Sequence, residues 1–159
     1  MGELLSLDAA MRARVHWRAV GERVVFTNGH FDLLHVGHLD YLEQARALGG
    51  ALLVGVNDDA STRRLKGSGR PLVPGVERAR LLAALVVVSG AILFDEDTAE
   101  MLIRALQPDI YVKGGDYHDK PLPERALVES LGGQVVLIDT LPDHSTTRLI
   151  ARVRALPAG

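Results

Sequence analysis

Three histidines, His30, His35 and His38, lie within nine residues in the segment TNGHFDLLHVGHLDYL. If a helix begins near residue 36, the spacing of three between His35 and His38 places both imidazoles on one face of its first turn. The N-terminus of a helix presents free N–H groups and a partial positive charge, and both favour anions. Imidazole donors in such a position predict a site that holds phosphate oxygens and stabilises charge on a phosphorus that is being transferred.

The histidine pair also fits two alternative roles. His35 and His38 could be surface or capping residues without a part in function. They could also bind zinc, but HVGH lacks the i, i+4 spacing and the glutamate of HExxH, and Asp32 would be the only carboxylate nearby. We therefore predict no metal-ligating residue. The chain also has no GxGxxG and no GxxxxGK[ST] motif, which argues against hydride transfer and P-loop chemistry.

Glycine and polar residues also end the first apolar run and open the last helical one. Asn28 and Gly29 follow VVFT, and a glycine there lets backbone amides approach a phosphate closely, although an ordinary turn accounts for the pair equally well. In HSTTR, residues 144–148, Ser145 or Thr146 is expected to cap a helix. The same geometry presents hydroxyls, amides and Arg148 to an anion, so capping and anion binding both fit this motif.

A polar, basic stretch follows the second apolar run. Asp58 and Asp59 close that run, and residues 60–71 then carry four basic side chains interspersed with glycine and serine: Arg63, Arg64, Lys66 and Arg70. We expect a mobile cationic loop that could fold over a phosphorylated substrate. A solvated surface loop is the alternative.

Short apolar runs alternate with amphipathic segments along the whole chain. The expected strands are 24–28, 51–58, 91–94, 109–115 and 134–139, and the expected helices are Leu4–Val20, 38–49, 75–85, 98–106, 123–132 and 146–156. Strands that are apolar almost throughout and separated by helices indicate a parallel sheet covered on both faces. We predict an α/β chain forming a single doubly wound, Rossmann-like domain over residues 1–159, with a leading helical segment at 1–21. Its five-stranded parallel sheet is expected in the order 3-2-1-4-5.

This topology predicts where a ligand binds. In open α/β sheets ligands lie beyond the carboxyl ends of the strands, where the strand order reverses, and here that point falls between the first and fourth predicted strands. The segments that leave these two strands, TNGHFDLLHVGH and VKGGDY, are the richest in glycine and polar groups. The histidines are therefore expected in the ligand crevice.

Composition excludes several classes of function. A formal charge of −2 gives no general attraction for nucleic acid, so an anionic ligand is expected to be a small molecule held locally. The chain contains no cysteine, which excludes disulfides, a thiolate nucleophile and cysteine-ligated zinc. No apolar run is long enough to span a membrane, and Met1–Gly21 lacks the features of a signal peptide. We expect a cytoplasmic protein without membrane or nucleic-acid partners.

Taken together, the motifs resemble those of a known family. HFDLLHVGH after Asn28-Gly29, with HSTTR at the last helix, resembles the HxGH nucleotidyltransferase (cytidylyltransferase-like) superfamily. Within it, VNDDAS, LKG, RP and VKGGDY are similar to the heptose 1-phosphate adenylyltransferases, and the similarity runs from about Val24 to Val153. His30 stands where that family is expected to have cysteine, a difference that should leave the chemistry unchanged.

The resemblance implies an enzyme that transfers AMP from ATP to a sugar 1-phosphate, with Mg²⁺, giving an ADP-sugar and pyrophosphate. Three alternatives remain: a cytidylyltransferase acting on glycerol 3-phosphate or phosphoethanolamine, an FMN adenylyltransferase, and a nucleotide-binding module without activity. The resemblance further implies a homo-oligomer, most simply a dimer, and a separate sugar kinase if the pathway is that of heptose.

The same resemblance assigns roles to individual residues. The implied catalytic residues are His35, His38, Lys66 and Arg148. The residues implied to bind the nucleotide are Asn28, Gly29, Phe31, Gly37, Lys113, Gly114, Asp116, Ser145 and Thr146. The residues implied to bind the acceptor are Asp32, Asp58 and Lys66.

Overall fold

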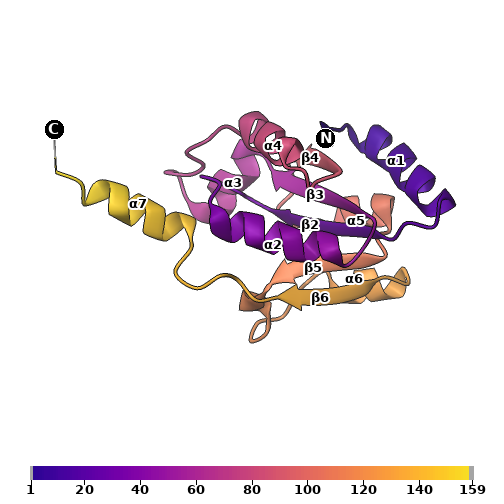
Figure 1. The fold of residues 1–159 in the computed structure, drawn as a ribbon. Coiled ribbons are helices and arrows are strands. Elements are labelled where there is room, and N and C mark those ends of the chain that lie inside the picture. Colours follow the sequence, from indigo (N-terminus) through magenta and orange to yellow (C-terminus); the bar gives the residue numbers. More distant parts are fainter. Residues whose placement is uncertain (1, 158–159) are drawn as a thin grey trace.

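One parallel sheet forms the centre of the protein (Figure 1). The computed structural model describes residues 2–157, apart from the side chain of Asp116. Within them the sheet has six strands in the order β1-β4-β3-β2-β5-β6, and every neighbouring pair is parallel. The strands are β1 (Glu3–Leu4), β2 (Val24–Gly29), β3 (Ala51–Asn57), β4 (Gly90–Phe94), β5 (Ile110–Gly114) and β6 (Gln134–Ile138).

Helices cover both faces of this sheet. They are α1 (Leu7–Ala19), α2 (Val36–Ala47), α3 (Asp59–Lys66), α4 (Gly75–Ala84), α5 (Glu100–Leu106), α6 (Arg125–Ser130) and α7 (Thr146–Arg154), with a 3₁₀ turn, η1, at Gly115–Tyr117. One buried cluster joins α2 and α4 to the sheet, and a second joins α1, α5 and α6 to its other face. Helix α7 has no buried residue and extends away from the sheet at one end of the molecule (Figure 1).

Strand β2 shows why the runs are apolar almost throughout. Val25 belongs to the cluster under α2 and α4, whereas Val24 and Phe26 belong to the opposite cluster, and all three are fully buried. Successive side chains of a strand point to opposite faces, so a strand covered on both faces needs apolar residues at every position.

The predicted order of the five long strands is confirmed. Strand β2 pairs with β3 on one side and with β5 on the other. The helix after β2 packs on one face of the sheet, while the helix after β5 packs on the other. The segments that leave these two strands therefore diverge and open a crevice between them.

The predicted number of strands was wrong, because a sixth strand lies at the edge. Glu3 and Leu4 pair with Gly90 and Ala91 of β4. The leading helix consequently begins at Leu7 rather than Leu4, with the Ser6 side chain accepting a hydrogen bond from the amide of Ala9. A two-residue strand has no periodicity to detect, and its pairing partner lies more than 80 residues away in sequence.

The predicted mobile cationic loop was also wrong over most of its length. Residues Asp59–Lys66 form α3, which carries Arg63, Arg64 and Lys66 in its last turn. Asp58 caps this helix by accepting from the amide of Ser61, and Gly67, with φ 98°, ends it. The cap and the terminal glycine are visible in the sequence, but the many charges and glycines nearby suggested a loop.

No helix in residues 2–157 is both long enough and apolar enough to cross a membrane.

The two-layer core predicts how leucine deletions differ. Leu102 on α5 is 1% exposed, whereas Leu81 on α4 is 51% exposed. Leu102→Ala should lower the free energy of unfolding by about 2–5 kcal/mol, because it leaves a cavity against the sheet. Leu81→Ala, the matched control, should lower it by less than about 1 kcal/mol. Urea unfolding followed by circular dichroism measures both, and equal losses would contradict the assignment of the core.

Candidate functional site

A cleft of about 420 Å³ lies beyond the carboxyl ends of β2 and β5. It is lined by Asn28, Gly29, His30, Phe31, His35, Gly37, His38, Tyr41, Lys66, Lys113, Gly114, Tyr117, Thr140, His144, Ser145, Thr146 and Thr147. The described lining contains many hydrogen-bond donors and no carboxylate, a combination that suits a highly anionic ligand.

The two histidines of HVGH form the start of α2. His35 is the N-cap residue, and its ring stacks on that of His38 with 3.9 Å between the ring centroids. Gly37 makes this packing possible, because a Cβ there would lie 2.9 Å from the Cβ of His144 and 3.0 Å from Nδ1 of His35. The glycine of the motif therefore lets the start of α2 approach the segment that leads into α7.

Hydrogen bonding determines which nitrogen of His35 carries the proton. Nδ1 accepts from the amide of Gly37 at 3.1 Å, so the proton of the neutral ring must lie on Nε2. Nε2 of His35 and Nδ1 of His38 are both buried and have no hydrogen-bond partner in the described part of the chain. Buried polar atoms are normally satisfied, so two unmet nitrogens in one cleft indicate that a ligand completes the site.

The histidines are neutral near pH 7. Burial, with a contribution from the positive charge of Lys66, lowers the pKa of His30 to about 4. Burial and the neighbouring His35 lower the pKa of His38 to about 4. Burial also lowers the pKa of His35, followed in effect by His144. Neutral imidazoles act here as hydrogen-bond donors and acceptors rather than as permanent charges.

Asn28 is held at the end of β2 by two donors from β5. Its Oδ1 accepts from the Tyr111 hydroxyl at 2.7 Å and from Lys113 Nζ at 3.3 Å. These bonds use the carbonyl end of the amide, so its NH₂ group is the end left for a ligand. Burial lowers the pKa of Lys113, whose ammonium also lies 5.4 Å from the centre of the Tyr117 ring.

The last helix reaches the cleft through its first turn. Ser145 caps α7 by accepting from the amide of Arg148, as expected from the sequence. The Thr146 hydroxyl donates to the carbonyl of Asp32 at 2.7 Å, which ties α7 to the loop after β2. His35, His38, Ser145 and Thr146 therefore line one cleft, although the two motifs lie about 110 residues apart.

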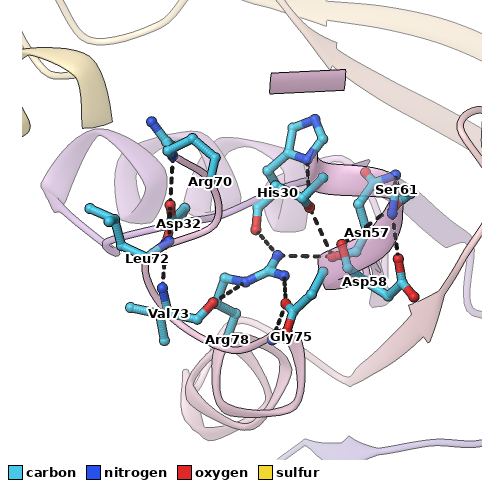
Figure 2. A network of polar contacts seen from close by, with 12 residues as sticks. His30, Asp32, Asn57, Asp58, Ser61, Arg70, Leu72, Val73, Gly75 and Arg78 are labelled. Carbon is cyan, nitrogen blue, oxygen red and sulfur yellow. Dashed lines mark hydrogen bonds and ion pairs between the residues drawn. The ribbon is translucent and has the colours of Figure 1, made fainter. Parts of the chain in front are cut away.

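The Asp32 side chain bonds to other segments of the protein. Its buried carboxylate accepts from the amides of Leu72 and Val73 and pairs with Arg70 at 2.8 Å (Figure 2). Burial opposes ionisation, but the two amides and Arg70 outweigh it and lower the pKa of Asp32. The hydrogen bonds and ion pair of its side chain are internal and it does not line the cleft, so the acceptor role expected for Asp32 stays a prediction.

Arg78 holds together the segments under the cleft. This residue of α4 is 1% exposed, and its guanidinium donates to the carbonyls of His30, Asn57 and Val73 (Figure 2). It also pairs with the Asp59 carboxylate at 2.9 Å. A planar fork with five donors can join four segments in this way, and lysine cannot. Sequence reasoning missed Arg78, because GVERARLLAAL reads as an ordinary amphipathic helix.

Most residues implied by the sequence line the cleft, but not all. Asp58 caps α3, and Arg148 pairs with Asp143 at the edge of a neighbouring cavity. The side chain of Asp116 lies outside the described part of the chain. The roles assigned by resemblance stay predictions for every one of these residues.

Six lining residues received no predicted role: His30, Tyr41, Tyr117, Thr140, His144 and Thr147. His144 and Thr147 belong to HSTTR, and their place in the motif could have suggested them. Tyr41 is on α2 one turn beyond His38, and its buried hydroxyl bonds Thr27 Oγ1 at 2.7 Å. Thr140 follows β6, and no local pattern predicts that its segment lies against the cleft.

Comparison with known proteins agrees with the geometry. Residues 26–152 match the model of the family described as cytidylyltransferase-like. The chain belongs to this family. The match includes both the HVGH and the STT segments, so the resemblance inferred from these motifs is confirmed, and with it the assignment to the nucleotidyltransferases.

Two relatives and one solved structure show what this cytidylyltransferase-like chain is similar to. It is 51% identical to a "Bifunctional protein HldE" of Syntrophotalea carbinolica over 94% of the chain, and 50% identical to that of Citrifermentans bemidjiense over 95%. The chain spans about a third of the length of these relatives, 32% and 31%. A crystal structure described as the lipopolysaccharide core biosynthesis protein from Thermoplasma volcanium is 30% identical, with a TM-score of 0.62, over 76% of this chain and 98% of that one.

The lowered histidine pKa values predict an unusual titration. In ¹³C or ¹⁵N NMR of labelled protein, His30 and His38 should titrate with midpoints near pH 4. An unfolded histidine titrates near about 6.5, so unfolding takes up protons between about pH 6.5 and 4, and stability should fall as the pH is lowered through this window. Midpoints above about 6 for both residues would contradict the lowering of their pKa values by burial in the cleft of this cytidylyltransferase-like protein.

The Arg78 network predicts a large effect of a conservative substitution. Arg78→Lys should lower the free energy of unfolding by about 2–4 kcal/mol, because buried carbonyls and Asp59 lose donors. Arg80→Lys, on the exposed side of the same helix, is the matched control and should stay within about 0.5 kcal/mol. Both are measured by urea unfolding. An equally stable Arg78→Lys protein would show that the guanidinium fork is dispensable.

Proposed function

We propose that the chain transfers AMP from ATP to heptose 1-phosphate, releasing pyrophosphate and forming an ADP-sugar. The observation that carries this proposal is the cleft itself, which is lined by paired neutral histidines and by Ser145 and Thr146, with no carboxylate among its described lining residues. The names of the relatives, HldE and lipopolysaccharide core biosynthesis protein, support a sugar acceptor over an alcohol phosphate.

The proposed reaction requires no nucleophile from the enzyme. A phosphate oxygen of the sugar 1-phosphate attacks the α-phosphorus of ATP, and the bond from that phosphorus to the bridging oxygen of pyrophosphate breaks. The electron pair leaves with pyrophosphate. An ionised phosphate already carries the attacking oxygen, so no general base is needed. A chain without cysteine, whose described cleft lining has no carboxylate, suits this chemistry.

Catalysis then depends on donors that are already in place. Stacking on His35 and contact with Phe31, whose ring centroid is 5.5 Å away, hold the His38 ring before substrate arrives. Preorganised donors stabilise the developing charge without reorganising during the reaction. In this proposal His35 and His38 bind the phosphates of ATP, and the capped start of α7 binds its β- and γ-phosphates.

The other subsites follow from what lines the cleft. Lys66, at the end of α3, would bind the phosphate of the acceptor. Lys113, Gly114 and the Tyr117 ring, beyond β5, would contact the nucleoside. Arg148 would turn from Asp143 toward the departing pyrophosphate.

Mg²⁺ would accompany the nucleotide. Within the described residues no group of three histidine, cysteine or acidic side chains could hold a metal ion. Mg²⁺ usually keeps several waters and binds through substrate phosphates with one or two carboxylates, rather than in a cage built by the protein alone. The donor set of the cleft therefore fits an ion that arrives with the triphosphate rather than one resident in the protein.

Cellular location and oligomeric state are part of the same proposal. Because the proposed reaction uses ATP, we propose that the protein acts in the cytoplasm. A homodimer is proposed because the segment 81–94 leaves apolar side chains uncovered in the single chain, with Leu81 51% and Val86 94% exposed.

A panel of substrates tests the function. Pyrophosphate release should be fast only with ATP and heptose 1-phosphate, and slow when CTP replaces ATP or when glycerol 3-phosphate, phosphoethanolamine or FMN replaces the sugar phosphate. Turnover that requires CTP would favour the cytidylyltransferase alternative, which the family description makes the strongest competitor.

A variant in the same assay ties activity to the cleft. His38→Ala should lower kcat by about 10²–10³-fold, the effect of losing one preorganised donor. Its circular dichroism spectrum should match that of the unchanged protein. Undiminished turnover would show that His38 has no part in catalysis.

A further inference from the structure

Two further cavities flank the central cleft, one on each side of α7. The first, of about 320 Å³, is called the Arg154 groove; Lys66, Arg70, Thr147, Ile150, Ala151 and Arg154 line it. The second, of about 340 Å³, is called the Arg152 groove; its lining includes His35, Asp143, Ser145, Arg148, Leu149 and Arg152.

The two grooves use different faces of α7. Residues 147, 150, 151 and 154 face the first groove, and residues 145, 148, 149 and 152 face the second. Each set follows the i, i+3, i+4, i+7 spacing of one helical face. Helix α7 extends away from the sheet (Figure 1). Because the two sets of lining residues lie on different faces of this helix, the helix separates the two grooves.

Both grooves continue from the central cleft at different points. Lys66 and Thr147 line the cleft and the Arg154 groove. His35 and Ser145 line the cleft and the Arg152 groove. A ligand bound in the cleft can therefore extend along either face of α7.

The charges in the grooves suit two different ligands. Among the residues that the structure describes, no carboxylate lines the Arg154 groove, and neither the Lys66 nor the Arg154 side chain has a hydrogen bond or an ion pair. Arg70 uses Nε for Asp32, which leaves its terminal nitrogens for other acceptors. Guanidinium groups at the wall of a groove bind hydroxyl and phosphate oxygens. The Arg152 groove adjoins both His35 and the capped start of α7, where anions are favoured.

We propose that α7 is a partition, with the sugar phosphate acceptor in the Arg154 groove and pyrophosphate leaving through the Arg152 groove. This proposal rests on the proposed transfer of AMP. An attacking oxygen and a leaving oxygen lie roughly in line on opposite sides of the phosphorus. Separate grooves on opposite faces of one helix meet this requirement and keep the two anions apart. Arg154 then recognises the body of the acceptor, while Lys66 binds its phosphate.

Two arginine variants on the same helix test the partition. Arg154→Ala should raise the KM for heptose 1-phosphate about tenfold and leave the KM for ATP within about twofold. Arg152→Ala should raise the KM for pyrophosphate about tenfold in the reverse reaction and leave the KM for the acceptor within about twofold. Arg12→Ala, on the exposed surface of α1 at the other end of the molecule, removes the same charge and should change neither KM.

A binding measurement separates this inference from the proposed function. In ¹⁵N-labelled protein, heptose 1-phosphate should shift the amides of Thr147, Ala151 and Arg154, and pyrophosphate those of Arg148 and Arg152. This result, together with turnover only from CTP, would reject the transfer of AMP and keep the partition. If both ligands shift the same face, if either ligand shifts neither face, or if both variants change the same KM, the partition is wrong.

Discussion

Asp32 is the residue on which the arrangement of the site depends. Its carboxylate accepts from the amides of Leu72 and Val73 and from Arg70, and its carbonyl accepts from Thr146. One buried residue thus joins the loop after β2, the segment after α3 and the first turn of α7. A buried carboxylate is stable only when its oxygens are paired and bonded, so the loop after β2 and the segment after α3 are held firmly against each other.

Arg78 likewise joins segments that lie under the cleft. It binds carbonyls at the ends of β2 and β3 and pairs with Asp59 at the start of α3. Phe31 and Leu33, with φ values of 49° and 50°, adopt the left-handed conformation that is unfavourable for residues other than glycine. Such strain persists where surrounding contacts determine the backbone, as Asp32 and Arg78 do here, and it is concentrated at functional sites.

The neutral histidines are tightly packed, whereas the last helix has few contacts with the rest of the protein. His35 and His38 are packed, stacked and desolvated, so their donors are rigid. Helix α7 has no buried residue, and Thr146 is its hydrogen-bonded tie to the loop after β2. A rigid half fixes the position of the phosphates, while a half with few contacts can adjust as substrates enter and products leave.

The sequence by itself determined the order of the five long strands, the crevice between β2 and β5, and the HVGH and STT motifs as partners. The apolar runs, caps and helix starts behind these predictions are local patterns, and the resemblance to a known family supplied the pairing of the two motifs. Only the tertiary structure decided that β1 exists, that the Asp32 carboxylate pairs with Arg70, and that Arg78 joins the segments under the cleft. Each of these depends on a partner between about 20 and 90 residues away, and hydrogen bonding and burial between such distant segments leave no periodic signal in the chain.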